Sequence, residues 1–420
     1  MKKTTMSEID ISNNICAGAV GAKKDVSQAD TKQKNLFLSS FLHELNKKKS
    51  AIFSANRKDI KLLHGRDDSF VDRLLFNSSN FDNVCGGIEE IIKLPDPIGT
   101  YGNFNKRPSG ISVGKMKVPL GVIFAIYESR PNVTVDIASL CIKSGNVVIL
   151  RGGKESIETN FVIGSCIKNA LVKSKLPAKS VQLIFDERRE IIKHLIRKDE
   201  IDCAVVRGGR NLIDYVNKFA TIPVLKHLNG NCHVYVDSQA NLEMAKSIIL
   251  NAKTRRFGVC SAVESLLINK DIANLFLPVI AKSLISKNVE IRGCERTLKI
   301  LPKSKKAVKS DWHTEYLAPI ISIKIIDSLE DAIGHINHYG SSHTDAIVTD
   351  NKKNADKFLM LVDSSSVIWN ASTAFADGGE YGLGGEVGIS TGKFHVRGPV
   401  GLNGLTCEKY IIIGDGSTRS

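Results

Sequence analysis

The chain has 420 residues, with 58 lysines and arginines against 44 acidic residues and a net charge of +14. Its content of 42% hydrophobic and 24% charged residues is ordinary for a globular protein, and its length allows two or three domains. No apolar run approaches the roughly 18 residues of a membrane span, and the N-terminus lacks the apolar core of a signal peptide. We therefore expect a globular protein without a membrane partner.

The positive charge raises the question of a polyanionic partner. The lysines are scattered, however, and short clusters occur only at 47–49 and 303–306. Nucleic-acid binding usually needs a focused basic patch, so a solvated surface is favoured and no nucleic-acid partner is expected. A basic nucleic-acid-binding protein is kept as the alternative from another functional class.

The first third of the chain is irregular. Residues 1 to about 30 are polar and weakly patterned, which predicts a frayed or loosely helical segment. Helical periodicity follows at 31–65. A stretch rich in Gly and Pro at 94–114 leads into alternating apolar residues at 111–118, which predict a hairpin or an extended arm.

From Gly121 onward the pattern becomes regular, because apolar β-rich runs alternate with helical segments. Such runs predict a parallel sheet covered on both faces by helices. The predicted strands are 121–127, 146–150, 181–185, 202–206, 223–228 and 233–237. The predicted helices are 133–143, 156–174, 187–198 and 211–219.

A second α/β run begins after position 260. Its predicted strands are 264–269, 318–326, 344–349 and 366–369, and its predicted helices are 271–287, 329–338 and 352–362. The fold class is therefore α/β, with two α/β lobes. The tail at 406–413 reads as a strand that pairs either with the arm at 111–118 or with another subunit.

Two glycine turns follow predicted strands and open predicted helices. They are RGGK at 151–154 and RGGR at 207–210. Glycines let the backbone approach an anion, helix N–H groups point at it, and basic side chains supply charge. Each alone could be an ordinary turn, but two at the carboxyl ends of strands in one sheet favour a nucleotide. The candidate cofactor-binding residues are Arg151, Gly152, Gly153, Lys154, Gly208 and Gly209.

Nine cysteines, an odd number without CxxC pairs, argue against a disulfide framework or a zinc ribbon, and no metal site is expected. Free thiols suggest a reducing cytosol. Most of the cysteines lie in apolar stretches, where a thiol is usually buried and inert. Cys260 differs, because it follows a glycine turn near Arg255 and Arg256, and nearby cations lower a thiol pKa. It is the candidate nucleophile that would bond to a carbonyl carbon.

Several long strings give a more specific resemblance. They are YESRPN at 127–132, YGSSHTDAI at 339–347, NASTAFADG at 370–378, YGLGGEVGIST at 381–391 and HVRGPVGL at 395–402. In this order they resemble the gamma-glutamyl phosphate reductases, also called glutamate-5-semialdehyde dehydrogenases, of the aldehyde dehydrogenase superfamily. The resemblance runs from about residue 35 to 415.

This resemblance implies an enzyme that reduces L-glutamyl 5-phosphate with NADPH to L-glutamate 5-semialdehyde and releases phosphate, in proline biosynthesis. Cys260 matches the family's nucleophile, which would carry the acyl group as a thioester. The resemblance also implies an NADP-binding lobe at 1–254 with an arm near 95–118, and a catalytic lobe at 255–392. The C-terminal segment at 393–420 would complete an arm for oligomerisation.

Further site residues follow from the resemblance. Glu315 matches the glutamate that holds the nicotinamide ribose, although a surface acid is its plainer interpretation. Asn132 is the candidate for oxyanion stabilisation, and the adjacent Arg130 is a candidate substrate contact. Ser372 and Thr373 lie where related enzymes bind a substrate carboxylate, but both could equally be turn residues.

Hydrolytic aldehyde dehydrogenases carry a glutamate base at the stretch that matches 226–230, and no carboxylate is present there. A reductase that must keep its thioester until hydride arrives has no use for such a base. His227 is a possible proton carrier, although a structural histidine is the plainer interpretation. The chain departs from the family at Ser261, Val263, Ala318 and Ala374, which bears on rate and affinity but not on the reaction.

The alternative enzyme is an oxidising aldehyde dehydrogenase that acts on a small amino-acid semialdehyde. Lys154, beside the first glycine turn, could contact the 2′-phosphate of NADPH and so favour NADPH over NADH. We also expect a cytoplasmic homo-oligomer. Functional coupling to a glutamate 5-kinase, which would supply the unstable acyl phosphate, is a further expectation.

Overall fold

The computed structural model of the chain describes residues 6–63, 68–128, 130–226 and 229–419. Their contacts form two compact units. Unit 1 comprises Met1–Lys226, Gly382–Gly388 and Val400–Ser420, and unit 2 comprises His227–Tyr381 and Ile389–Pro399. Each unit is built around its own parallel sheet, as the two predicted lobes require.

The sheet of unit 1 has five parallel strands in the order β5-β4-β3-β6-β7. The strands are β3 (Val122–Tyr127), β4 (Val147–Arg151), β5 (Val181–Leu183), β6 (Cys203–Arg207) and β7 (Val224–Leu225). The helices that connect them are α6 (Pro131–Lys143), α7 (Ile157–Ser174), α8 (Arg189–Leu195) and α9 (Arg210–Phe219). All six residues of β3 are buried, which fits the continuous apolar runs of a sheet covered on both faces.

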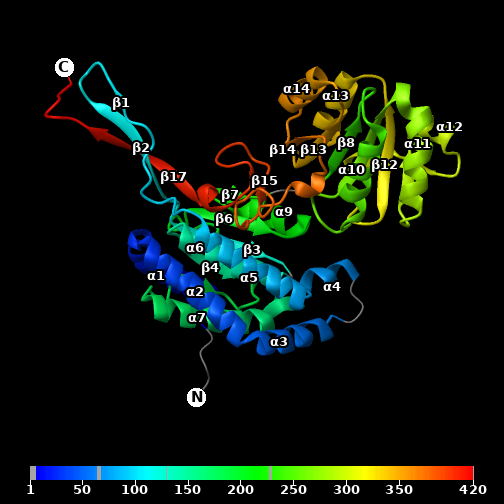
Figure 1. Cartoon of the computed structure of the whole chain (residues 1–420). Coiled ribbons are helices and arrows are strands. Elements are labelled where there is room, and N and C mark those ends of the chain that lie inside the picture. The colour runs from blue at the N-terminus through cyan, green and yellow to red at the C-terminus, as the bar shows by residue number, and fades with distance from the viewer. Residues whose placement is uncertain (1–5, 64–67, 129, 227–228, 420) are drawn as a thin grey trace. The chain divides into compact units, whose positions relative to one another are not determined.

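In the described part of the chain, five helices precede this sheet, and Figure 1 shows them beside the sheet and the helices that cover it. They are α1 (Glu8–Gln28), α2 (Thr31–Lys47), α3 (Lys49–Lys61), α4 (Asp68–Leu74) and α5 (Ser78–Lys93). The expectation of a frayed N-terminus is wrong for α1, a 21-residue helix that packs on α8 and on β3 to β5. Its buried face consists of small residues spaced three or four apart, Cys16, Ala19, Ala22 and Val26, which gives only a weak hydrophobic pattern.

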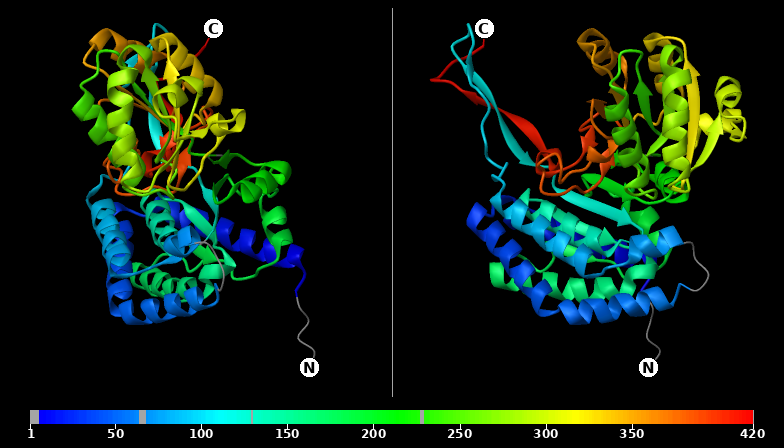
Figure 2. Two further views of the ribbon diagram at one scale, coloured as in Figure 1. Left: turned by 90° about the vertical axis from the view of Figure 1, so that its right-hand side faces the viewer. Right: turned by 45° about the vertical axis from the view of Figure 1, so that its right-hand side comes forward.

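Three antiparallel strands form an arm in unit 1, visible as the cyan and red ribbons in Figures 1 and 2. The strands are β1 (Asn105–Lys106), β2 (Ser112–Pro119) and β17 (Thr406–Ile413), in the order β1-β2-β17. Strand β17 pairs with β2 along its whole length, from Thr406 opposite Pro119 to Ile413 opposite Ser112. The pairing predicted between the tail and the 111–118 segment is therefore confirmed.

The sheet of unit 2 has seven parallel strands in the order β11-β10-β12-β9-β8-β13-β14. They are β8 (Cys232–Val236), β9 (Val263–Asn269), β10 (Glu290–Gly293), β11 (Lys305–Lys306), β12 (Ile320–Ile326), β13 (Thr344–Val348) and β14 (Ser366–Trp369). The main helices are α10 (Leu242–Thr254), α11 (Lys270–Ile285), α12 (Glu295–Ile300), α13 (Leu329–Tyr339) and α14 (Lys352–Leu361). Strand β10 and helix α12 had no counterpart among the predicted elements.

The boundary between the units differs from the expected division at 254/255. Strand β8 and helix α10, which we assigned to the first lobe, belong to unit 2 because β8 pairs with both β9 and β13. The chain also returns to unit 1 at Gly382–Gly388 before its final segment. An alternating pattern of strands and helices does not reveal which sheet a strand joins, and this ambiguity explains the error.

Alternate residues of the strands in unit 2 face two separate cores. Val234, Leu266 and Ile323 pack with α10 and α11 on one face, whereas Tyr235 and Leu267 pack with α13 and α14 on the other. Figures 1 and 2 show the strands between these two pairs of helices. In the described part of the chain, no helix combines the length and the apolar composition needed to cross a membrane.

Candidate active site

The glycine turns of unit 1 lie at the carboxyl edge of its sheet. Gly152 follows β4, Gly208 follows β6, and Arg130 lies just beyond β3 between them. Parallel strands end at the same edge, so the structure brings the predicted cofactor residues and the Arg130–Asn132 turn to one side of this sheet.

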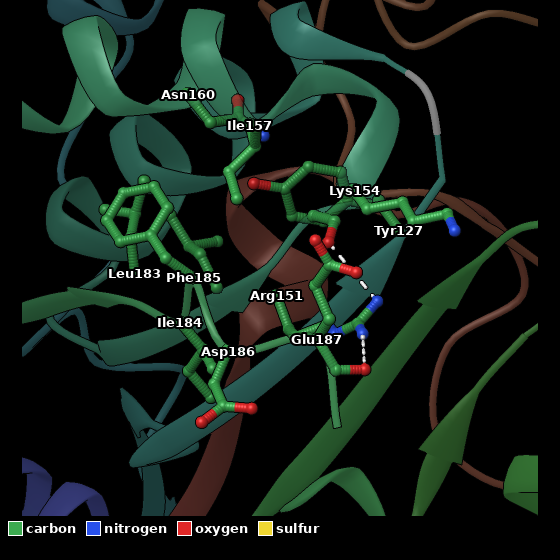
Figure 3. Close-up of a pocket in the computed structure, with 13 residues that line it drawn as sticks. Tyr127, Arg151, Lys154, Ile157, Asn160, Leu183, Ile184, Phe185, Asp186 and Glu187 are labelled. Carbon is green, nitrogen blue, oxygen red and sulfur yellow. Dashed lines mark hydrogen bonds between the residues drawn. The ribbon is translucent and has the colours of Figure 1, made fainter. Parts of the chain in front are cut away.

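A pocket of about 340 Å³ surrounds the first glycine turn. The apolar side chains of Leu183, Ile184 and Phe185 form part of its wall. Figure 3 shows these side chains on one side of the pocket and Lys154, which is exposed, extending on the other. An apolar wall beside an exposed cation suits a ligand with an aromatic base and a phosphate group.

Arg151 stabilises this turn through hydrogen bonds to two backbone carbonyl oxygens. Its guanidinium donates to the carbonyl oxygens of Gly152, at 3.3 Å, and Glu187, at 3.1 Å, as the dashed lines in Figure 3 show. Burial lowers the pKa of Arg151. A Cβ at Gly152 would lie 2.5 Å from the Asn160 side chain, so this position requires glycine.

Asp59 of α3 already occupies the start of helix α7. Its carboxylate accepts hydrogen bonds from the backbone amides of Glu158, at 3.1 Å, and Thr159, at 2.9 Å. We expected such amides to point at a phosphate, and for these two the expectation is wrong because a buried side chain satisfies them. Any anion at this turn must therefore be held by Lys154 and the residues of the turn itself.

The second glycine turn shows the same feature. The Gly209 amide, at the start of α9, donates to the Glu128 carboxylate at 2.7 Å. A Cβ at Gly208 would lie 2.8 Å from that carboxylate. Both turns thus hold a carboxylate against a helix N-terminus, where the helix dipole favours negative charge. The assignment of Gly208 and Gly209 to the cofactor remains a prediction.

The predicted substrate contacts of unit 1 lie at the start of α6. Arg130 precedes Pro131, which occupies the first helical turn. The Asn132 amide nitrogen donates to Asp136 at 3.3 Å, one helical turn further on. Their roles at the acyl group remain predictions from the resemblance.

Cys260 lies in the loop between α10 and β9, at the amino edge of the sheet of unit 2, and is partly exposed. Gly230, which precedes β8, and Cys232, the first residue of β8, both lie against the backbone of Cys260. The buried Cys232 thiol donates to the Cys260 carbonyl oxygen at 3.1 Å. A Cβ at Gly230 would lie 2.0 Å from the same oxygen, so only glycine fits there. Cys260, the predicted nucleophile, is therefore fixed through its main chain, and its thiol is not used in these contacts.

A β-bulge follows Cys260 in the chain. Cys232 pairs with Val263 and His233 pairs with Ser265, so Glu264 is the extra residue on β9. Its carboxylate meets the Lys253 ammonium at 2.5 Å, and both side chains are fully buried. Burial raises the pKa of Glu264 to about 7, with Lys253 opposing the shift, and burial lowers the pKa of Lys253. Neither residue was singled out in the sequence, because the pattern gives no sign that two charges 11 positions apart are paired.

Glu315 belongs to the same neighbourhood. It precedes β12, and its charge acts on Cys232, Lys253 and Glu264. The Glu264 carboxylate also accepts from the Leu317 amide at 3.1 Å. Glu264 thus links the Cys260 loop to the Glu315 segment, although the two are distant in sequence.

Thr373 contacts the nucleophile loop directly. Its hydroxyl donates to the Ser261 carbonyl oxygen at 2.7 Å, and the side chain is fully buried. Ser372 is also buried, and its hydroxyl accepts from the Ala374 amide at 3.2 Å. The Ser372 hydroxyl has a local partner, as the alternative of a turn residue predicts, whereas the Thr373 hydroxyl binds a segment distant in sequence. Their contact with a substrate carboxylate remains a prediction.

The stretch at 226–230 matches the one that carries the base in hydrolytic aldehyde dehydrogenases, and it is only partly described. His227 and Leu228 lie outside the described residues. Asn231, just beyond them, donates to the carbonyl oxygens of Trp312, at 2.8 Å, and Tyr339, at 2.9 Å. It fixes the segment that leads to Glu315.

Comparison with known proteins agrees with this geometry. The model of the aldehyde dehydrogenase family matches residues 12–293. The crystal structure of gamma-glutamyl phosphate reductase from Thermotoga maritima is 40% identical, with a TM-score of 0.93, over 97% of this chain and 100% of that one. The chain belongs to the gamma-glutamyl phosphate reductases of the aldehyde dehydrogenase family.

Other members fit the same assignment. The gamma-glutamyl phosphate reductase of Saccharomyces cerevisiae is 33% identical over 99% of this chain and 100% of that one, with a TM-score of 0.55. An acetylating aldehyde dehydrogenase from Geobacillus thermoglucosidasius, at 14% identity and a TM-score of 0.71 over 98% of each chain, shares the fold. Enzymes of this family use NAD(P), and the donor set of the pocket beside Lys154 fits such a cofactor.

A buried hydrogen-bond network behind the site was missed by the sequence reasoning. The Asp345 carboxylate accepts from the His233 amide at 2.8 Å and contacts the His233 ring at 2.9 Å. The Cys232 thiol also approaches His343 at 3.8 Å. The string at 339–347 was noticed as a family signature, but nothing in it shows that its polar residues face the start of β8.

Proposed function

We propose that this protein reduces L-glutamyl 5-phosphate to L-glutamate 5-semialdehyde with NADPH and releases phosphate, as a step of proline biosynthesis. One observation carries the proposal. A partly exposed Cys260 is fixed through its backbone in a chain that matches a gamma-glutamyl phosphate reductase almost from end to end.

Cys260 performs the first step. Its thiolate attacks the acyl carbon, the bond from that carbon to the phosphate oxygen breaks, and the electron pair leaves with phosphate. The product is a thioester on Cys260. Gly230, Cys232 and Thr373 support this step because they hold the main chain of the loop in one position.

When bound, NADPH supplies the hydride that converts the thioester to a thiohemiacetal. The bond between carbon and the Cys260 sulfur then breaks, which releases the aldehyde and restores the thiolate. Asn132 is the proposed oxyanion donor in both steps, with Arg130 beside it, and Ser372 and Thr373 are the proposed contacts of the amino-acid end of the substrate.

The cofactor would be held in two places. Lys154, with Arg151, Gly152 and Gly153, would bind the adenosine end, and the exposed ammonium of Lys154 suits a 2′-phosphate. Gly208 and Gly209 would approach the pyrophosphate, and Glu315 would hold the nicotinamide ribose. The apolar wall of the pocket supports this assignment because a purine base needs such a surface.

The absence of a carboxylate at 226–230 favours reduction over oxidation to an acid. Water needs a base to attack a thioester at a useful rate, and the stretch that supplies one in hydrolytic relatives has none. The thioester therefore persists until hydride arrives.

We further propose a cytoplasmic homo-oligomer coupled to a glutamate 5-kinase. All nine cysteines are unpaired, which suits a reducing compartment. Strand β17 is an edge strand with exposed Tyr410, Ile412 and Ile413, and such edges favour pairing with another chain. An acyl phosphate is unstable in water, so a kinase must supply it close to the point of use.

The decisive experiment runs the reaction backwards, with L-glutamate 5-semialdehyde and NADP⁺. The proposal predicts that NADPH forms only when phosphate is present. Sustained NADPH formation without phosphate, with glutamate as the product, would show an oxidising aldehyde dehydrogenase instead. A filter-binding assay that showed tight, steeply salt-dependent nucleic-acid binding would favour the nucleic-acid alternative.

A further inference from the structure

Lys324 is a charged residue on a central strand of the second sheet. Strand β12 lies between β9 and β10, and its residues Ile323 and Ile325 belong to the core beneath α10 and α11. Lys324 faces the opposite side, the side of α13. Inner strands of parallel sheets are normally apolar on both faces, so a lysine here requires a physical reason.

The Lys324 ammonium sits among aromatic rings. Its nitrogen lies 3.0 Å from Nδ1 of His335, 5.6 Å from the centre of the Trp312 ring and 5.8 Å from that of Tyr339. An ammonium can only donate, so Nδ1 accepts and the neutral ring carries its proton on Nε2. Burial holds the pKa of His335 far below its usual value, with neighbouring cations adding to the shift.

Both groups retain unused donors. The ammonium has three N–H bonds, and among the described residues its hydrogen bond is to His335. His335 is only 5% exposed, and its Nε2 has no hydrogen-bond partner among the described residues. A buried donor without an acceptor is costly, so the Nε2–H of His335 points to a missing acceptor. The partly exposed Lys324 ammonium beside it has N–H bonds left for the same acceptor.

The nearby carboxylates do not supply that acceptor. Asp327 pairs with Arg296 at 2.7 Å, and Asp331 accepts from the Ser328 hydroxyl at 2.8 Å. In the described parts of the chain, no carboxylate lies within 4 Å of the Lys324 ammonium. The cation therefore has no carboxylate counter-ion.

Charged groups of both signs lie near Lys324. Burial lowers the pKa of Lys324, the charges of Cys294 and Asp331 oppose this shift, and that of Arg296 adds to it. The thiol of Cys294 is engaged with the Thr297 hydroxyl at 3.3 Å.

A groove of about 690 Å³, its open mouth included, lies over this strand. Its polar lining consists of Arg296, Lys324, Asp327, Asp331, His335 and His338. Lys324 pairs in register with Leu267, well beyond the start of β9 at Val263, which Cys260 precedes. The groove is therefore displaced along the sheet from the edge that carries the nucleophile.

We propose that this groove binds an oxyanion, the carboxylate or phosphate group of a small molecule, with Lys324 as its charged contact and His335 beside it. The unused donors, the missing counter-ion and the size of the groove all fit a small anionic metabolite. The ring of Tyr339, which also lines the groove, would lie beside the anion. The inference does not depend on the proposed reaction.

The test is a titration of the full chain labelled at histidine, followed by NMR. Inorganic phosphate and acetate are added in separate series at constant ionic strength. We expect saturable shifts of the ring signals of His335 and His338, assigned with H335Q and H338Q. The shifts should disappear in K324M and persist in K282M, which removes an exposed lysine of α11 on the other face of the sheet.

The two series separate the sources of the anion. Tighter saturation with acetate identifies a carboxylate ligand, and tighter saturation with phosphate identifies a phosphorylated one. The proposal is overturned if neither anion gives saturable shifts at these histidines, or if K324M responds as the wild type does. The wild-type titration decides the matter even if K324M does not fold.

Discussion

The two sheets of this protein carry their functional residues at opposite edges. In unit 1 the glycine turns follow strands β4 and β6, at the carboxyl edge. In unit 2, Gly230, Cys260 and Glu315 all precede strands, at the amino edge. Helix N-termini meet the first edge and helix C-termini meet the second.

This difference explains how each site is built. At the carboxyl edge, helix dipoles favour anions, and two carboxylates, Asp59 and Glu128, already exploit that field. At the amino edge, in the part of the chain that the structure describes, no helix N-terminus is present to favour a negative charge. The predicted nucleophile is supported instead by buried partners such as Cys232 and the Lys253–Glu264 pair. We expect the first site, which is open to solvent, to tolerate the loss of one contact. The second site depends on the packing of buried residues. The following predictions test this contrast.

Removal of the nucleophile should have the largest effect. Cys260→Ala should lower turnover by at least about a thousand-fold, because no covalent intermediate can form. The side chain is only partly buried, so thermal unfolding should change little. The control is Cys294→Ala, a second partly buried thiol in the same unit that should retain activity. Substantial turnover by C260A would place the nucleophile elsewhere.

Loss of the buried ion pair between Lys253 and Glu264 should have the second-largest effect. At pH 8, where the Glu264 carboxyl is ionised, Lys253→Met or Glu264→Gln alone leaves one buried charge unpaired, and each should lower the free energy of unfolding by about 3–5 kcal/mol. The double variant removes both charges and should recover most of that loss, with Gln still able to accept from the Leu317 amide. Denaturant unfolding measures all three. Additive losses in the double variant would show that the two residues act independently.

The same pair predicts a dependence of stability on pH. Burial raises the pKa of Glu264 to about 7, so between about pH 4.5 and 7 the folded protein binds a proton that the unfolded chain has released. The contribution to stability is full below the unfolded pKa and is lost as pH rises through the folded pKa. Wild type should therefore lose more stability than E264Q between pH 5 and 8. Parallel stability curves for the two proteins would contradict this.

Backbone packing behind the nucleophile should have a smaller effect. The Cβ of Gly230→Ala would clash with the Cys260 carbonyl, so the loop must move, and kcat should fall by about 10- to 100-fold. Gly86→Ala in α5, where a Cβ meets no atom within 4 Å, is the control and should keep full activity. An unchanged kcat in G230A would mean that the loop position is not critical.

A substitution at the carboxyl edge of the sheet of unit 1 should have the smallest effect. Lys154→Ala should raise KM for NADPH about tenfold and leave KM for NADH unchanged, because one charge-assisted contact is lost. Lys168→Ala, an exposed lysine of α7, serves as the matched control. An unchanged ratio of the two KM values would remove Lys154 from cofactor selection.

Much of the fold could be predicted from the sequence, because apolar strands and helical segments alternate so regularly. The tail strand was predicted to pair either with the 111–118 arm or with another subunit, and it pairs with the arm. The assignment of β8 to the first lobe failed, because strand patterns do not encode sheet membership. Helix α1 was expected only as a frayed or loosely helical segment, because alanine and cysteine bury a face without a strong hydrophobic signal.

The residues of the candidate site also divide into those that the sequence revealed and those that only the structure revealed. Cys260 and the glycine turns stand out because turns and reactive side chains leave local signals. Gly230, Lys253, Glu264 and Thr373 leave none, because each acts on a partner that only the fold brings near. Lys324 did leave a signal, a charge inside an apolar strand, but its meaning depends on the missing counter-ion, which only the structure reveals.

The central claim is that Cys260 holds an acyl group that water does not remove. A rapid-mixing experiment with L-glutamate 5-semialdehyde and NADP⁺, in the absence of phosphate, tests it directly. We predict a burst of one NADPH per Cys260, then arrest, with turnover resuming when phosphate is added. Continuous NADPH formation without phosphate, with glutamate as the product, would contradict the account.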